Sequence, residues 1–158
     1  MGLKTFQDQN TGHIWLDLDN FFNKTFNDMK ATAVAAGFTV ANKSDVSQLL
    51  SSLPDPNVNW TSYTAIMGEA PNRALIWGAY DQTPGDNSHD WAYSWSDSDS
   101  WSYQPNAYAN NVVPNGGSRD ADMNLWAYRG GAVVPLPASF LLLGPGLAAV
   151  AVLRRKMK

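Results

Sequence analysis

A dense group of aromatic side chains stands among small polar residues in the second half of the chain. Trp and Tyr rings can stack on the apolar faces of sugars, while neighbouring amides and carboxylates hydrogen-bond to the sugar hydroxyls. This pattern predicts a carbohydrate-binding segment. The alternative is a β-rich core, because the first three rings alternate at strand period and would point to one side. The candidate contact residues are Trp91, Tyr93, Trp95, Trp101 and Tyr103.

Other side chains that could carry chemistry form weaker patterns. The two histidines, His13 and His89, are far apart and lack partners at metal-ligand spacing. A hydrolytic pair of His89 with Ser88 or Ser94 lacks the glycines of a nucleophile elbow. Nothing around Glu69, the single glutamate, marks it as a general acid with a raised pKa. We therefore predict no catalytic residue, no cofactor and no assigned metal ligand, and a secreted hydrolase is the least favoured function.

Several acidic clusters offer the hard oxygen ligands that calcium prefers. An EF-hand loop starting at Asp8 would place His13 at position six and Asp19 at position twelve, so that motif is absent. Asp and Asn are also the commonest turn residues, and a turn role stays open beside a calcium role. The clusters are Asp8, Asn10, Asp17 and Asp19; Asp81, Asp86 and Asp90; and Asp97 and Asp99.

The C-terminal end of the chain has three consecutive parts. A Pro-containing motif, Val134-Pro135-Leu136-Pro137-Ala138, precedes an uncharged apolar run over 139–153, and a basic stop follows at 154–158. As a helix, the sixteen residues 138–153 would cover roughly 24 Å, and starting from Val133 extends this to roughly 32 Å, about the thickness of a bilayer core. We therefore expect a transmembrane helix whose C-terminus is cytoplasmic, because Arg154, Arg155 and Lys156 favour that side.

This three-part tail, residues 133–158, resembles the PEP-CTERM sorting signal in its VPLPA form. The resemblance implies that an exosortase, an intramembrane cysteine protease, recognises residues 134–138 and cuts near them. It also implies a bacterial source with an exopolysaccharide-rich surface. The expected localisation is the inner membrane before processing and the cell surface or extracellular matrix afterwards. The expected partners are the exosortase, the membrane and, through the aromatic segment, exopolysaccharide.

Charge and composition narrow the partners further. Four of the 11 basic residues lie in the last five positions, so the chain before them carries 7 basic and 14 acidic residues, a formal charge of −7. That balance argues against nucleic acid and against anionic lipid, because both require clustered Lys and Arg. The chain has no cysteine, so disulfides and thiol chemistry are excluded. Residues 1–8 contain no apolar run of signal-peptide length. Either a leader lies upstream or this copy is not exported, and we favour the upstream leader.

Local patterns predict the elements that position these side chains. Residues 6–12 read as a turn, and a helix over 25–36 stops at Gly37. Ser44 is the expected N-cap of a second helix that Pro54 and Pro56 end. Strands are expected over 13–18, 38–41, 73–80, 91–95 and 125–129.

Helices come early in this order and strands come late. It predicts an extracytoplasmic α+β domain over residues 1–132, with early helices packed on a mostly antiparallel sheet. The order also resembles the domain that often accompanies VPLPA tails, through the residues Asp8, Thr11-Gly12 and Trp15-Leu16-Asp17-Leu18. The Thr-Gly-x-x-Trp strand is similar to that of C-type-lectin-like domains, although their Asp-Trp-Arg-Leu-Pro segment is missing. A C-type-lectin-like fold is therefore the finer expectation.

Overall fold

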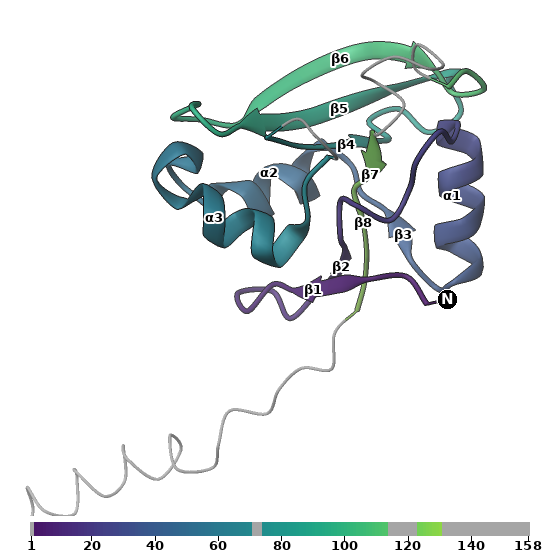
Figure 1. The fold of residues 1–158 in the computed structure, drawn as a ribbon. Coiled ribbons are helices and arrows are strands. Elements are labelled where there is room, and N and C mark those ends of the chain that lie inside the picture. Colours follow the sequence, from purple (N-terminus) through teal and green to yellow (C-terminus); the bar gives the residue numbers. More distant parts are fainter. Residues whose placement is uncertain (1, 71–73, 114–122, 131–158) are drawn as a thin grey trace, which may run out of the picture.

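The computed structural model describes residues 2–70, 74–113 and 123–130 (Figure 1). Within these ranges the chain is an α+β domain with mostly antiparallel sheets, which confirms the predicted fold class. The helices are α1 (Phe26–Ala35), α2 (Lys43–Ser51) and α3 (Pro56–Met67). The strands are β1 (Thr5–Gln7), β2 (Ile14–Leu16), β3 (Thr39–Val40), β4 (Leu75–Tyr80), β5 (Ser88–Trp95), β6 (Ser102–Ala109), β7 (Asn124–Leu125) and β8 (Ala127–Arg129).

The strands form two four-stranded sheets. The first has the order β1-β2-β8-β3 and is antiparallel throughout. The second has the order β6-β5-β4-β7, in which only the β4–β7 pair is parallel. In Figure 1, β4, β5 and β6 form the upper part of the domain, with α2 and α3 on the left and α1 on the right. The β1 strand lies at the opposite, lower end.

One residue carries the chain from the second sheet to the first. Trp126 stands between β7 and β8 and is completely buried. Its backbone N–H donates to the carbonyl of Ala79 over 2.8 Å, and its own carbonyl accepts from the N–H of Ala41 over 2.9 Å. Its indole N–H donates to the carbonyl of Ala92 over 3.2 Å. The expected single strand over 125–129 is therefore two short strands, because this buried ring turns the chain between sheets.

The first two helices begin at side-chain caps. Thr25 caps α1, and its hydroxyl accepts from the backbone N–H of Asp28 over 3.0 Å, as expected from the predicted start at residue 25. The cap of α2 is Asn42, whose amide oxygen accepts from the N–H groups of Ser44 and Asp45. The prediction that Ser44 caps this helix was wrong, because Asn42 is better placed to accept from the free N–H groups of the first turn.

The third helix was missed because its proline was interpreted as an end signal. Pro56 is the first residue of α3, a position where the missing N–H would have no partner and the fixed φ already suits a helix. Asp55 before it has a φ of 50° and makes no side-chain cap hydrogen bond. The helix then buries Tyr63 and Met67 against the body of the domain.

Two strands were also missed. The β1 strand occupies the start of the segment predicted to be a turn, and only the residues after Gln7 turn back toward β2. The β6 strand contains Pro105 and a register irregularity, since His89 of β5 pairs with Tyr108 whereas Trp91 pairs with Gln104. A proline is tolerated in β6 because this strand is the edge of the described sheet.

The β4 strand separates two hydrophobic clusters. Ile76 and Tyr80 belong to the cluster that includes α2 and α3, whereas Trp77 and Ala79 belong to the cluster that includes α1. Alternate residues of a strand point to opposite faces, so the sheet is buried on both sides at this strand. This explains why the sequence of β4 is apolar over its whole length instead of alternating.

Gly78 in the middle of β4 allows a close approach between the sheet and the residues packed on it. A methyl group at this position would lie 3.0 Å from Leu18 Cδ2 and 3.0 Å from Trp126 Cδ1, both on fully buried side chains. Gly78→Ala is therefore expected to lower the free energy of unfolding by about 1–3 kcal/mol, measured by urea denaturation. Gly130→Ala is the control, since a methyl group there meets nothing within 4 Å. Equal stabilities of the two variants would contradict the packing.

The two candidate caps of α2 make opposite predictions. Asn42→Ala removes the acceptor for two N–H groups and is expected to cost about 1 kcal/mol of stability. Ser44→Ala is expected to change stability by less than about 0.5 kcal/mol, because Ser44 is an exposed residue of the first turn. Thermal unfolding of both variants separates the cases, and a larger loss for Ser44→Ala would restore the sequence-based assignment.

Candidate functional site

The structure brings three of the five predicted carbohydrate-contacting rings together on one face of β5. Tyr93 stacks on Trp95 with ring centroids 5.6 Å apart and an interplanar angle of 29°. On its other side Tyr93 meets Trp91 edge to face, with centroids 6.2 Å apart. Successive rings alternate with Ala92 and Ser94, which point to the opposite face. We call Trp91, Tyr93 and Trp95 the aromatic row.

Side chains of both neighbouring strands flank the aromatic row. Trp77 of β4 lies 5.2 Å from Trp91, and Tyr108 of β6 lies 5.3 Å from it, measured between ring centroids. Two polar residues of β6 are also in register with the row: Ser102 pairs with Tyr93 and Gln104 pairs with Trp91. Directly paired residues of antiparallel strands share a face, so an aromatic line and a polar line run side by side.

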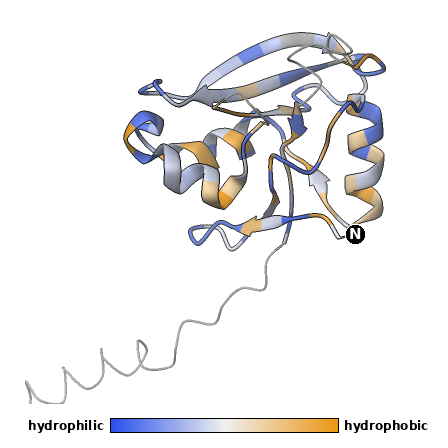
Figure 2. Cartoon of the chain, viewed as in Figure 1, coloured by the Kyte–Doolittle hydropathy of each residue, from blue (hydrophilic) through white to orange (hydrophobic). Residues whose placement is uncertain are grey.

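The aromatic row passes from the core to the surface along β5. Trp91 and Tyr93 are half-buried and pack against the cluster that includes α1. Trp95 is 41% exposed, the largest exposure of any aromatic side chain in β4, β5 or β6 whose burial is described. In Figure 2 most of β5 and β6 is pale or blue, since Trp, Tyr, Ser and Gln have low hydropathy. The rings thus serve the core at one end of the row and face solvent at the other.

The remaining two predicted contact residues lie on the opposite face. Tyr103 pairs with Ala92, and the Lys43 Nζ atom lies 5.8 Å from the centre of its ring. Trp101 packs against the cluster that includes α2 and α3, and its indole N–H donates to the carbonyl of Leu53 over 2.7 Å. The structure therefore does not join Trp101 and Tyr103 to the aromatic row.

His89 extends the line of rings inward. It is buried, stacks on Phe26 at 4.8 Å, and its Nδ1 atom lies 3.0 Å from the amide oxygen of Asn110. An amide oxygen only accepts, so this contact is a hydrogen bond in the tautomer with the proton on Nδ1. Burial lowers the pKa of the imidazole. Ser94 lies on the opposite face of β5, and its hydroxyl donates to the carbonyl of Ser100. The arrangement makes His89 a packing residue between α1 and the sheet.

The acidic clusters mostly serve turns and ion pairs. Asp8 is buried and accepts from the backbone N–H of Asn10 over 2.9 Å, as expected for a turn residue. Asp81 pairs with Lys30 over 3.0 Å. Over residues 2–70, 74–113 and 123–130, no three His, Asp or Glu side chains come together in a way that could hold a metal ion.

The carboxyl group of Asp17 lies in an environment that raises its pKa. Burial, followed by repulsion from Asp19, raises its pKa from 3.8 to about 6, while Lys4 opposes the shift. Lys4 itself pairs with Asp19. Raised carboxyl pKa values are a feature of general acids, yet neither of the hollows described next is lined by Asp17. This group is therefore a local electrostatic cost of the fold, and the sequence did not predict its raised pKa because burial decides it.

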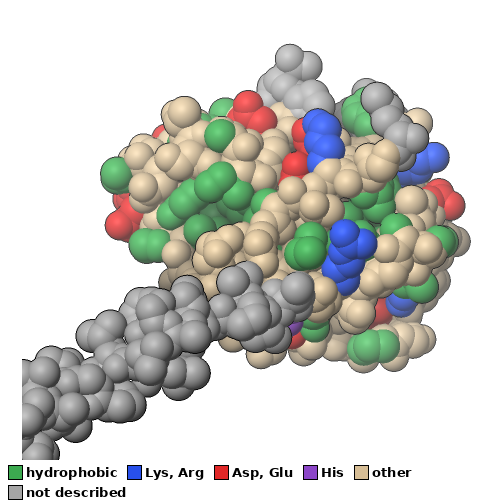
Figure 3. All heavy atoms as spheres, turned by 90° about the horizontal axis from the view of Figure 1, so that it is seen from below, with side chains coloured by type: hydrophobic (Ala, Val, Ile, Leu, Met, Phe, Trp, Pro, Cys, Tyr) green, Lys and Arg blue, Asp and Glu red, His purple; other side chains and the backbone are tan. Residues whose placement is uncertain are grey.

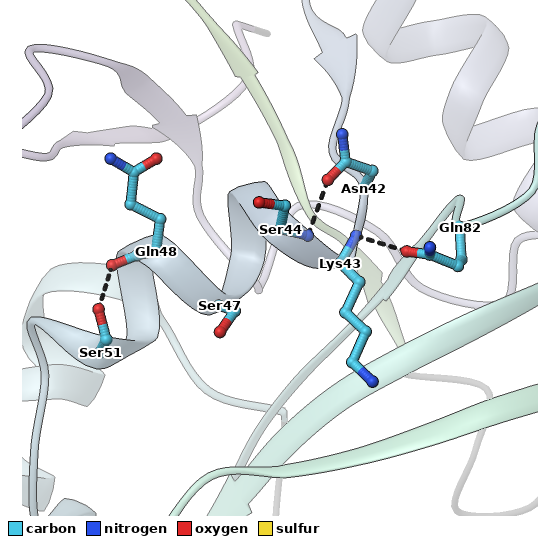
Figure 4. A pocket seen from close by; sticks show the side chains of 7 residues that line it. All are labelled: Asn42, Lys43, Ser44, Ser47, Gln48, Ser51 and Gln82. Carbon is cyan, nitrogen blue, oxygen red and sulfur yellow. Dashed lines mark hydrogen bonds between the residues drawn. The ribbon is translucent and has the colours of Figure 1, made fainter.

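Among the hollows formed by the described residues, two lie along α2 on the helical side of the domain. A shallow one of about 660 Å³ follows the exposed face of α2 (Figure 4). The backbone N–H groups of Ser44 and Lys43 there are already engaged, because Asn42 accepts from Ser44 and Gln82 accepts from the Lys43 N–H over 3.1 Å. The other, of about 210 Å³, lies between the β1–β2 turn and α2 and α3. Its lining includes Phe6, Leu53, Tyr63, Ile66 and Met67.

The predicted sorting signal lies outside the described residues. This applies to the motif Val134, Pro135, Leu136, Pro137 and Ala138, to the apolar run 139–153, and to the basic stop Arg154, Arg155 and Lys156. Among helices in the described ranges, none has both the length and the apolar composition that crossing a bilayer requires.

Comparison of the chain with protein-family models, curated proteins and solved structures finds no match.

The environment of Asp17 predicts a pH-dependent stability difference. A folded-state pKa of about 6, above the ordinary 3.8, means that the folded protein binds this proton more tightly, so stability falls as pH rises between these values. Asp17→Asn removes the charge and is expected to stabilise the protein by about 1 kcal/mol at pH 7, allowing for solvent screening, and by nearly nothing at pH 4.

Urea denaturation at both pH values measures this difference. The matched control is Asp97→Asn, which changes an exposed carboxyl group after β5 and is expected to have no such pH dependence. A stabilisation by Asp17→Asn that is the same at pH 4 and pH 7 would be incompatible with the raised pKa.

Proposed function

We propose that this chain is a non-enzymatic exported protein, delivered to a bacterial cell surface or its extracellular matrix by its C-terminal tail. The observation that carries the proposal is the order of three elements in the sequence: the motif at 134–138, the uncharged run at 139–153 and the basic stop at 154–158. An apolar run followed by clustered Lys and Arg is the physical requirement for a membrane helix with a cytoplasmic end.

The folded body supports a tail that can be removed. The last described strand, β8, lies inside the first sheet between β2 and β3, and Arg129 at its end is exposed. Both hydrophobic clusters of the described residues are built from side chains up to Tyr128. Cleavage near Ala138 would therefore leave these clusters intact, and the released product would keep its core.

The proposal has two finer parts. Before processing, residues 133–153 span the inner membrane, with a helix over 139–153. Gly144-Pro145-Gly146 breaks the middle of this helix, which membrane helices tolerate better than soluble ones. The outer domain has a C-type-lectin-like fold, which is compatible with the early helices and the mostly antiparallel sheets.

The positions of the chemistry-bearing side chains support a non-enzymatic role. His89 is buried and faces away from Ser94, so the two cannot act as a base and a nucleophile. The carboxyl group of Asp17, despite its raised pKa, stands beside Asp19 and Lys4 outside the two hollows on the helical side.

Processing of the tail is tested in the native host. The chain, encoded at its own locus, is expected to lose the apolar run and the basic stop by a cut near the motif 134–138 and to be recovered outside the inner membrane, as measured by fractionation and mass spectrometry. The double variant Pro135→Ala, Pro137→Ala is expected to remain full length in the membrane fraction, because the recognition motif is lost.

Val133→Ala, a change just before the motif, is the matched control and is expected to be processed like the natural chain. Recovery of the natural chain at full length in the cytosol would refute the delivery proposal.

A further inference from the structure

We propose that the aromatic row, together with Ser102 and Gln104 of β6, binds a neutral polysaccharide, with Trp95 as the principal contact ring. This goes beyond the delivery proposed above, because it states what the delivered domain recognises. It rests on the described body alone and does not depend on how the tail is processed.

Trp95 is held in place before any ligand arrives. One face of its indole stacks on Tyr93, which in turn contacts Trp91 edge to face. The exposed 41% of Trp95 therefore lies on the remaining face and edges of a ring whose orientation is supported from behind. A supported ring loses little conformational freedom on binding, which favours stacking on the apolar face of a sugar.

Hydrogen-bonding side chains of β6 lie beside the aromatic row. Ser102 and Gln104 share the face of the aromatic row, one strand away at about 5 Å, and the Gln104 side chain is exposed. A hydroxyl and an amide both donate and accept, as a sugar hydroxyl does. Since β6 is the edge of the described sheet, a sugar chain can lie along it and contact both lines at once.

The charges on and around the sheet favour one class of polysaccharide. Strands β4, β5 and β6 contain no Lys or Arg, and their single acid, Asp90, points to the face opposite the row. The chain before the last five residues carries 7 basic and 14 acidic residues, which disfavours an anionic polymer. Figure 3 shows the opposite, lower end of the domain, where the Lys and Arg side chains are scattered and do not form a patch. A neutral saccharide is the partner that this surface fits.

The exposed apolar area of the aromatic row is too small to bind a second copy of the chain. A stable protein interface needs about 800 Å² on each partner. A whole Trp side chain supplies only about 150–250 Å² of contact area. In the described parts of β4, β5 and β6, Trp95 is the one large hydrophobic residue that is exposed. The surface is a narrow strip, which suits one polysaccharide strand better than a protein face.

Binding is tested with the full-length chain, kept soluble in a zwitterionic detergent without a sugar headgroup. Migration is followed in native gels that contain a neutral β-glucan, xylan or galactomannan, or the acidic polymers alginate and hyaluronan, and calorimetry gives the affinities. At least one neutral polymer is expected to retard the protein, and the acidic polymers are not. Trp95→Ala and Gln104→Ala are each expected to weaken binding about five- to tenfold, with a smaller loss for Trp95→Phe.

Phe22→Ala is the matched control, since Phe22 is 65% exposed in the loop between β2 and α1 and lies outside the row. Its affinity is expected to equal that of the natural chain. Circular dichroism checks that each variant is folded, and if Trp95→Ala unfolds, Gln104→Ala decides. The proposal is overturned if no neutral polymer binds, if an acidic polymer binds better, or if the row variants bind like Phe22→Ala.

Discussion

The structure depends on the passage of the chain between its two sheets at Trp126. Three hydrogen bonds hold this residue, to Ala79 of β4, to Ala41 after β3 and to Ala92 of β5. Its ring also meets Trp15 of β2 edge to face, at 6.2 Å between centroids. One buried residue therefore touches both sheets through backbone and side chain, and this sets how they pack against each other. A smaller side chain here would leave a cavity and would remove the hydrogen bond to the Ala92 carbonyl.

This joint also stabilises strands that are too short to persist alone. The β7 and β8 strands have two and three residues, well below the usual length. Beside the joint, the buried amide of Asn124 accepts from the backbone N–H of Phe21 over 2.7 Å and donates to its carbonyl over 3.3 Å. These bonds join positions 103 residues apart in the sequence, so the fold is complete only when the segment with β7 has packed against the loop before α1. The predicted tail starts directly after that closure.

Elements that neighbouring residues specify could be predicted from the sequence. Features that depend on residues far away along the chain could not. The α1 helix follows from Thr25 and from the apolar spacing after it, and β4 follows from its apolar run. The α3 helix was missed because a proline starts a helix as readily as it ends one. The alternation of Trp91, Tyr93 and Trp95 predicted their shared face, but no local signal predicted which face Trp101 and Tyr103 would occupy. Trp91 and Trp101 differ in role because β6 pairs with β5 in one register, which places them on opposite faces.

The two sheets divide the work that the proposals assign to the chain. The strand that leads toward the tail, β8, belongs to the first sheet, and its end points away from β5 and β6 in Figure 1. The aromatic row belongs to the second sheet, at the other end of the domain. A domain anchored through the end of β8 would therefore present the row away from its anchor. If both proposals hold, retention by the membrane and contact with a polysaccharide would use different surfaces, and binding would not require that the tail be cut first.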